Sequence, residues 1–302
     1  MIAAAELQCK LRVDRRKAVR GGNRSGRGTT GEHGLLSTSP FRQAAFAAGA
    51  FVLVMASPAF AQDDDGGSTR TRIGLGGQAH PNFPGSDEFD ITPMFDFDRA
   101  KGDEPFRFEG PDDSFGFALV RSRGIRVGPV VNFEGSRDAD DVGALLPKVK
   151  FSLEPGGFVQ FDLSDSFRLR GELRKGVTGH KGWIALAGAD YVARDGDNWL
   201  FSIGPRVSWS NDRYQDAWFG ITPADAIASG LPAYDPGGGI HAVGVTASFE
   251  TQLSPRWGIQ TYAKYDRLVG DAADSPIVTV LGSRDQFSGG LGLTYTFGEG
   301  ID

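Results

Sequence analysis

The 302-residue chain is acidic, with 32 Lys and Arg against 38 Asp and Glu. The imbalance is larger beyond residue 61, since residues 62–302 carry 23 basic and 35 acidic side chains, a net charge of about −12. So acidic a chain argues against nucleic acid as a partner. The single cysteine, Cys9, comes earlier, so residues 62–302 have no thiol for catalysis, metal ligation or a disulfide.

The amino-terminal segment has the features of a secretory signal peptide. Arg42 precedes an apolar run over residues 44–56, and a small-x-small cleavage site ends at Ala61. The run is too short to span a bilayer as a helix. We therefore expect a leader over residues 1–61 and a mature chain that begins at Gln62.

This leader is longer than usual because an Arg-, Gly- and Ser-rich stretch over residues 1–40 precedes the signal. Either an upstream start codon is wrongly assigned, or the leader is genuinely extended. Residues 1–61 are in both cases excluded from the fold.

From residue 70 onward, apolar and polar residues alternate with the period of two that predicts β-strands. In the last run, Phe287 to Phe297, large apolar or aromatic residues occupy nearly every odd position, with only Ser, Gly and Thr between them. The pattern predicts twelve strands, at residues 70–79, 88–98, 105–110, 114–122, 124–134, 150–163, 166–176, 181–194, 198–211, 240–253, 256–269 and 286–297. The alternative is ten strands, if residues 105–110 and the neighbouring segment are not strands.

Strand length separates a membrane barrel from a soluble sandwich. Most runs approach ten residues, about the length that a tilted strand needs to cross the hydrocarbon, whereas soluble strands average roughly five or six. Aromatic residues stand at the run ends, as interfacial girdles require. These residues are Trp183, Trp199, Trp209, Trp257, Tyr295 and Phe297. The chain also ends soon after the closing-strand signal Tyr295 and Phe297, as outer-membrane barrels do.

The predicted fold class is therefore all-β, an antiparallel transmembrane β-barrel in a Gram-negative outer membrane. Residues 62–69 are expected to form a short periplasmic segment, 70–297 the barrel and 298–302 a short tail. Outer-membrane lipid, lipopolysaccharide and the barrel assembly machinery follow as expected partners.

The connections between strands alternate in length. Tight turns are expected at 101–103, 122–124, 164–166, 195–197 and 254–256, and long loops at 135–149, 212–239 and 270–285. An even strand count places the turns and both termini in the periplasm and the loops outside. Within the longest loop, Thr222 as N-cap, Pro223 at the first helical position and Gly230 at the end predict a short helix.

Charged residues at lumen-facing positions are the most suggestive candidate site. Arg168, Arg170, Glu172 and Arg174 alternate along one strand. They would either pair across the interior and plug the barrel, or line a pore that attracts anions. The candidate partners across the interior are Asp90, Asp96, Asp98 and Glu250.

No catalytic, cofactor or metal-binding residues are predicted. His80, His180 and His241 lack the spacing of a zinc motif. Carboxylate pairs such as Asp112 and Asp113 are expected in solvated loops. A phospholipase that uses His241 on the lipid-facing side is a weaker alternative, because no serine is positioned beside it.

Two loops carry a resemblance to a known family. The first match includes Trp218, Phe219, Gly220, Ser229, Gly230, Leu231 and Pro232, and the second includes Asp271, Asp274, Ser275 and Pro276. These stretches resemble the MipA/OmpV family of outer-membrane proteins, sharply over residues 199–297 and diffusely over 70–198. Departures from the family pattern are the long leader, the acidic strand 88–98 and the tail 298–302 after the closing aromatic residue.

The resemblance implies a non-enzymatic scaffold. Its best-known members link the outer membrane to peptidoglycan remodelling by binding a lytic transglycosylase and a penicillin-binding protein from the periplasmic side. Other relatives are linked to osmotic adaptation, adhesion and antibiotic uptake, so family membership does not select one activity. The alternative expectation is a narrow, porin-like solute or ion channel.

Overall fold

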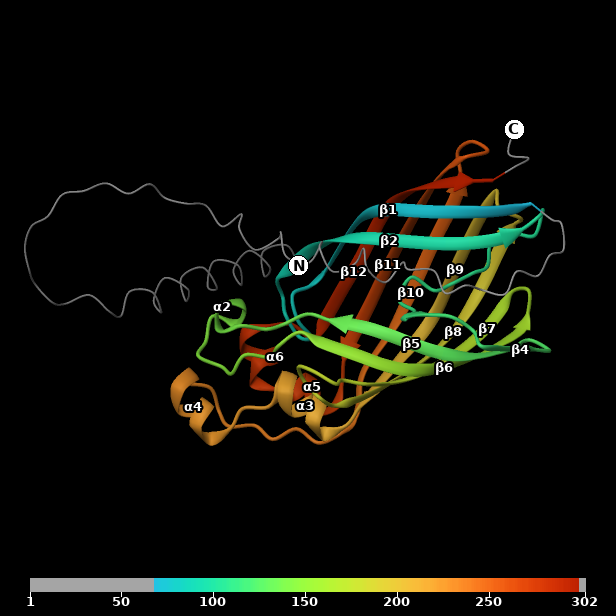
Figure 1. Ribbon diagram of the computed structural model, residues 1–302. Helices are drawn as coiled ribbons and strands as arrows, with labels where there is room; N and C mark the ends of the chain where they lie inside the picture. Colours follow the sequence, from blue (N-terminus) through green and yellow to red (C-terminus); the bar gives the residue numbers. More distant parts are fainter. Residues whose placement is uncertain (1–67, 299–302) are drawn as a thin grey trace, which may run out of the picture. The chain divides into compact units, whose positions relative to one another are not determined.

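The computed structural model describes residues 68–298, which form one curved antiparallel sheet with helices gathered at one end (Figure 1). The expected leader and cleavage site, residues 62–67 of the periplasmic segment and residues 299–302 of the tail lie outside the described residues.

The sheet has ten long strands and two very short ones. They are β1 (Thr69–Pro81), β2 (Phe89–Lys101), β3 (Phe115–Gly116), β4 (Val120–Ser122), β5 (Ile125–Glu134), β6 (Ser152–Ser164), β7 (Phe167–Lys175), β8 (Trp183–Asp195), β9 (Trp199–Ser210), β10 (Gly239–Gln252), β11 (Trp257–Leu268) and β12 (Asp285–Phe297). The long strands have 9 to 14 residues, enough to cross a bilayer when tilted.

The sequence places the ten long strands correctly but misjudges residues 105–122. Residues 105–110 form no strand, and the expected strand 114–122 is only β3 and β4, separated by a bend at Leu119. Phe115 and Val120 both face outward, so the bend shifts the pleat by one residue. Close approach to β5 also requires Gly128, because a Cβ there would collide with the carbonyl oxygen of Phe117.

Alternation sorts the side chains onto two faces. On β9, Trp199, Phe201 and Ile203 are exposed on the outer face, while Ser202 and Arg206 are buried on the inner one. The same division holds around the sheet and is what lipid outside and polar groups inside demand. No helix within residues 68–298 is long and apolar enough to cross a membrane.

Pairing of β1 with β12 joins the two ends of the barrel sequence, with Thr71 opposite Phe297. The strand order is β2-β1-β12-β11-β10-β9-β8-β7-β6-β5-β3, with β4 also paired to β5. β2 is therefore one edge of the sheet, and β3 and β4 form the other. The chain between these edges, residues 102–114, leaves the wall and enters the interior.

Tight connections lie at one end of the barrel, which we call the turn end, and the helices lie at the other, the loop end (Figure 1). The helices are α2 (Ala139–Val142), α3 (Asp212–Phe219), α4 (Pro223–Ser229), α5 (Gly270–Asp274) and α6 (Pro276–Leu281). The expected helix is confirmed as α4, where the Thr222 side chain accepts from the Asp225 amide and Gly230 is left-handed. The sequence did not predict the other four.

An apolar cap closes the loop end. Trp218, Phe219 and Ile277 are fully buried in a cluster drawn from all three long loops. Arg137 is 2% exposed and donates to the carbonyl oxygens of Trp218 and Ala217 at the C-terminus of α3. Burial lowers the pKa of Arg137 to about 10, and nearby Asp141 opposes this shift.

Tyr214 fastens the cap to the barrel wall. It is 4% exposed, and its hydroxyl donates to Glu134 Oε1 at 3.0 Å. Its ring packs on His180 and His241, with centroids 4.8 and 5.3 Å away. Burial, reinforced by the charge of Glu134, raises the pKa of Tyr214 well above its ordinary value, so the hydroxyl remains a donor.

We expect Tyr214→Phe to lower the free energy of unfolding by about 1–3 kcal/mol, because the Glu134 carboxylate loses a donor in a buried site. The midpoint temperature at which the unboiled gel mobility converts to the boiled one measures this change. Tyr234→Phe is the control, since the Tyr234 hydroxyl donates to the Asp271 carbonyl at 2.8 Å in an exposed position. Equal shifts in both variants would contradict the anchoring role of Tyr214.

Candidate functional site

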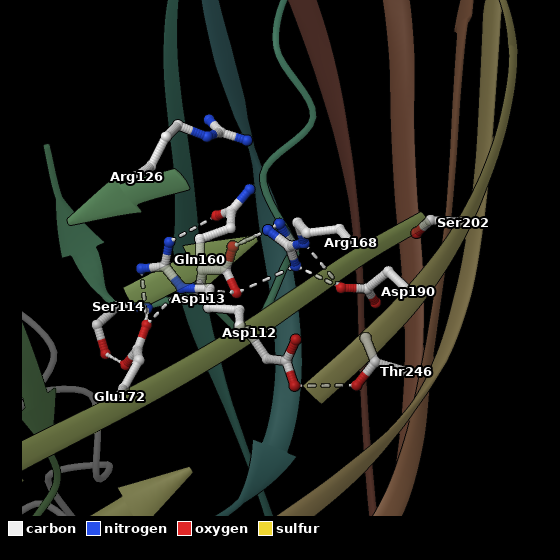
Figure 2. A network of polar contacts seen from close by, with 12 residues as sticks. Asp112, Asp113, Ser114, Arg126, Gln160, Arg168, Glu172, Asp190, Ser202 and Thr246 are labelled. Carbon is white, nitrogen blue, oxygen red and sulfur yellow. Dashed lines mark hydrogen bonds and ion pairs between the residues drawn. The ribbon is translucent and has the colours of Figure 1, made fainter. Parts of the chain in front are cut away.

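The interior of the barrel is filled by its own chain. Asp112 accepts from Thr246 Oγ1 on β10 at 3.0 Å and lies 3.0 Å from Arg206 Nε on β9 and 3.2 Å from Lys264 Nζ on β11. Asp113 lies 2.6 Å from Arg168 Nη1 on β7. A segment can reach the inner faces of four strands only from inside the sheet, as Figure 2 shows for Asp112 and Asp113. We call residues 104–114 the lumen segment.

Phe106 anchors the lumen segment near the turn end. Its side chain is 2% exposed, and the guanidinium groups of Arg70 and Arg72 lie over its ring, 5.0 and 4.7 Å from the centroid. Its amide donates to Asp197 Oδ1 at 2.9 Å, and its carbonyl accepts from Arg194 Nη1 at 2.8 Å. This backbone pairing with side chains replaces the ladder bonds that the expected strand 105–110 would have made.

Acids and bases alternate through the interior in one continuous network. Asp190 is 2% exposed and bridges Arg168 and Arg206. From Arg168 the network continues through Asp113 and Arg170, which lie 3.4 Å apart. In spatial order its members are Lys264, Asp112, Arg206, Asp190, Arg168, Asp113, Arg170, Glu172, Arg174 and Glu154. Such mutual pairing is what makes a buried charge tolerable.

The predicted charge ladder lies on the inner face of β7 and is largely buried. Arg170 contacts Glu172 at 2.8 Å, and Arg174 contacts Glu154 at 3.3 Å. Ser114 of the lumen segment donates to Glu172 Oε2 at 2.6 Å. The ladder therefore pairs with itself, its neighbouring strands and the lumen segment.

The acids expected to pair with the ladder lie elsewhere. Asp98 and Glu250 are 2.7 and 2.8 Å from Arg72. Asp96 lies on the same half-buried face of β2 as Asp98, and Asp90 is exposed near the start of that strand. Asp113 pairs with Arg168 and Arg170 in place of these acids. The solvated loop expected for Asp112 and Asp113 is therefore wrong, because their side chains are only 11% and 12% exposed inside the barrel.

The residues of the two loop motifs meet in the apolar cap. Ser275 is fully buried and its hydroxyl donates to the Phe219 carbonyl at 2.7 Å. Asp271 Oδ2 accepts from the Gly237 amide at 2.7 Å. Trp218 and Leu231 are buried, and Pro276 starts α6. Gly220 and Gly230 end α3 and α4, and Ser229 donates to the Asp225 carbonyl. Asp274 pairs with Arg284, and Pro232 is exposed.

At the other end of the barrel, the rings of the closing-strand residues Tyr295 and Phe297 pack edge to face, with centroids 4.7 Å apart.

Glu134, Glu154 and His180 bring potential metal-ligand atoms within 4.8 Å of one another. The Gly182 amide donates to His180 Nδ1 at 2.9 Å, so Nδ1 carries no proton. Nε2 therefore holds the proton and donates to Glu154 Oε1 at 2.8 Å. Metal ligation at Nε2 would require the opposite tautomer. The geometry fits a buried hydrogen-bonded cluster better than a metal centre.

The lipid-facing position expected for His241 is wrong. A register shift between Ile240 and Ala242 turns His241 inward, where it is buried 3.1 Å from Ser210 Oγ. The sequence did not indicate Ser210, because the register shift that brings it beside His241 arises from the pairing of β9 with β10 and is not visible in either strand alone. Gln215 donates to the same serine, and Tyr214 packs over the histidine, so the pair lies beneath the cap.

We expect Asp112→Asn to destabilise the barrel by on the order of 3 kcal/mol, because Arg206 and Lys264 would lose their shared carboxylate in a buried site. Urea unfolding in detergent, followed by tryptophan fluorescence, measures the change. The control is Asp138→Asn, which removes the exposed ion pair with Lys148 at 2.9 Å. It should lower the free energy of unfolding by at most about 1 kcal/mol. A similar small effect in both variants would mean that Asp112 does not hold the lumen segment.

Comparison with solved structures returns membrane barrels at low similarity. An outer-membrane channel from Pseudomonas putida F1 is 10% identical, with 76% of this chain and 96% of that chain covered and a TM-score of 0.37. The CymD monoaromatic hydrocarbon channel is 8% identical, with 76% of this chain and 89% of that chain covered and a TM-score of 0.31. The outer membrane protein OprG from Pseudomonas aeruginosa is 11% identical, with 76% of this chain and 96% of that chain covered and a TM-score of 0.23. Scores this low carry no argument about function.

A search of curated proteins found no match. The family comparison is decisive, because residues 73–297, from β1 to the end of β12, match the family described as MltA-interacting protein MipA. That range contains the lumen segment, nearly all of the sheet and both loop motifs of the cap. The chain belongs to the MipA family.

Proposed function

We propose that this chain is a non-enzymatic outer-membrane scaffold that holds a peptidoglycan-remodelling enzyme at its periplasmic face. The family description names interaction with MltA, and a lytic transglycosylase is the partner that this name implies. The observation that carries the proposal is the lumen segment, whose acids bind the inner faces of β7, β9, β10 and β11.

A filled interior favours a scaffold over a pore. Solute passage would require charges such as Asp113 and Arg168, 2.6 Å apart, to separate in a narrow space. The apolar cap, with Trp218 and Ile277 fully buried, closes the loop end as well. Other molecules would therefore contact such a barrel at its rim.

The turn end is the periplasmic rim in this proposal, and the loop end faces outward. The outer wall contacts lipid, and the exposed loops lie at the level of lipopolysaccharide. Tyr295 and Phe297 close the barrel sequence and are the residues that the assembly machinery would read. A penicillin-binding protein is a further candidate partner at the turn end.

Capture from cross-linked cell envelopes tests the scaffold. We expect a lytic transglycosylase among the proteins captured by the full-length chain and a several-fold lower yield with Lys101→Glu and Arg256→Glu combined, two exposed positions at the turn end. The matched control combines Lys148→Glu with Arg213→Glu at the loop end, which should leave the yield unchanged. Absence of peptidoglycan enzymes from the wild-type capture would refute the scaffold.

A narrow channel is the second candidate, because a cavity of about 500 Å³ enters the interior at the turn end. Single-channel recordings of the purified wild type and Arg170→Ala distinguish the two functions. A closed interior predicts no conductance from the wild type. Steady conductance from the wild type would overturn the closed interior, and silence in both proteins would remove the channel.

A further inference from the structure

The cavity at the turn end concentrates positive charge. It has a volume of about 500 Å³ and lies between the lumen segment and the turns that follow β4 and β6. Six arginines line it against only two aspartates, although the mature chain as a whole is strongly acidic. The arginines are Arg107, Arg121, Arg123, Arg126, Arg168 and Arg194, and the aspartates are Asp162 and Asp165. We call this cavity the arginine vestibule.

Half of these arginines already have carboxylate partners. Arg126 makes two bonds of 2.9 Å to Asp162, Arg168 binds Asp113 and Asp190, and Arg194 binds Asp197. Arg107, Arg121 and Arg123 form no ion pair with any residue of the described range 68–298. Three guanidinium groups therefore remain to bind an anion within one cavity.

The hairpin that joins β4 to β5 bears two local costs. Arg121 is directly opposite Arg126 in the ladder, and like charges at opposed positions repel. The two turn residues, Arg123 and Gly124, have φ values of 49° and 79°. Such a turn favours Asn-Gly, and a long side chain with positive φ is strained. Two unfavourable arginines in one hairpin indicate a ligand that compensates for them.

We propose that the arginine vestibule binds a phosphate-class oxyanion, carried either by a phospholipid headgroup or by a soluble phosphate. Guanidinium groups bind phosphate oxygens through paired hydrogen bonds. Three of them, from the lumen segment, β4 and the turn, supply enough donors and positive charge for inorganic phosphate, which is nearly doubly charged, or for the singly charged phosphodiester of a phospholipid. Both sources can reach the site, because β4 is an edge strand whose Val120 is exposed on the outer face.

The test uses the full chain, purified in detergent and free of phosphate, with two probes. Isothermal titration with inorganic phosphate addresses the soluble source, and native mass spectrometry with added phosphatidylglycerol addresses the lipid source. The test variant combines Arg121→Gln with Arg123→Asn, which removes the like-charge contact and places Asn in the strained position. It should therefore fold at least as well as the wild type, as judged by unboiled gel mobility. The control combines Arg213→Gln with Arg267→Gln, two exposed arginines at the loop end.

We expect the wild type and the control to bind one of the probes and the test variant to bind it at least tenfold more weakly. Binding of inorganic phosphate assigns a soluble ligand, and binding of phosphatidylglycerol alone assigns a lipid headgroup. The proposal is overturned if the wild type binds neither probe, or if the test variant binds as tightly as the control.

Discussion

Buried cations inside the barrel need carboxylate partners, and this requirement shapes the whole interior. Arg206, Lys264 and Arg168 point inward from three strands, where lipid outside and the pleat of the sheet leave them no other direction. Asp190 bridges two of them, and Asp266 lies 3.1 Å from Lys264. Asp112 and Asp113 add a further carboxylate to all three cations, and to do so the lumen segment must leave the wall.

That departure explains the architecture of the sheet. β2 and the short β3 and β4 remain as edges because the chain between them is committed to the interior. Buried ion pairs are weak contributors to stability when compared with apolar packing, yet breaking one is costly. The network therefore acts mainly to specify where the lumen segment lies, and any pore would have to break it.

The two ends of the barrel differ in the interactions that hold them. At the loop end, apolar side chains of three loops pack together, and Ser275 joins the two motif loops through Phe219. At the turn end, the lumen segment is held by Arg70, Arg72 and Asp197, and the neighbouring cavity keeps an excess of arginine. The first arrangement seals and the second leaves charge available, which is consistent with an interaction surface on the turn side.

Local sequence patterns predict the ten long strands, nearly all of their outward and inward positions, the turns, the long loops and helix α4. Those features follow from local periodicity, strand length and capping chemistry, as in Trp199–Ser210 and Thr222–Gly230. It also identified Arg168, Arg170, Glu172 and Arg174 as an inward-facing set. Their partners depend on the folded chain, since Asp113 reaches Arg168 across more than 50 residues. The fate of residues 105–110 and the inward turn of His241 were likewise decided by long-range charge pairing and ladder register, and neither is encoded in a local pattern.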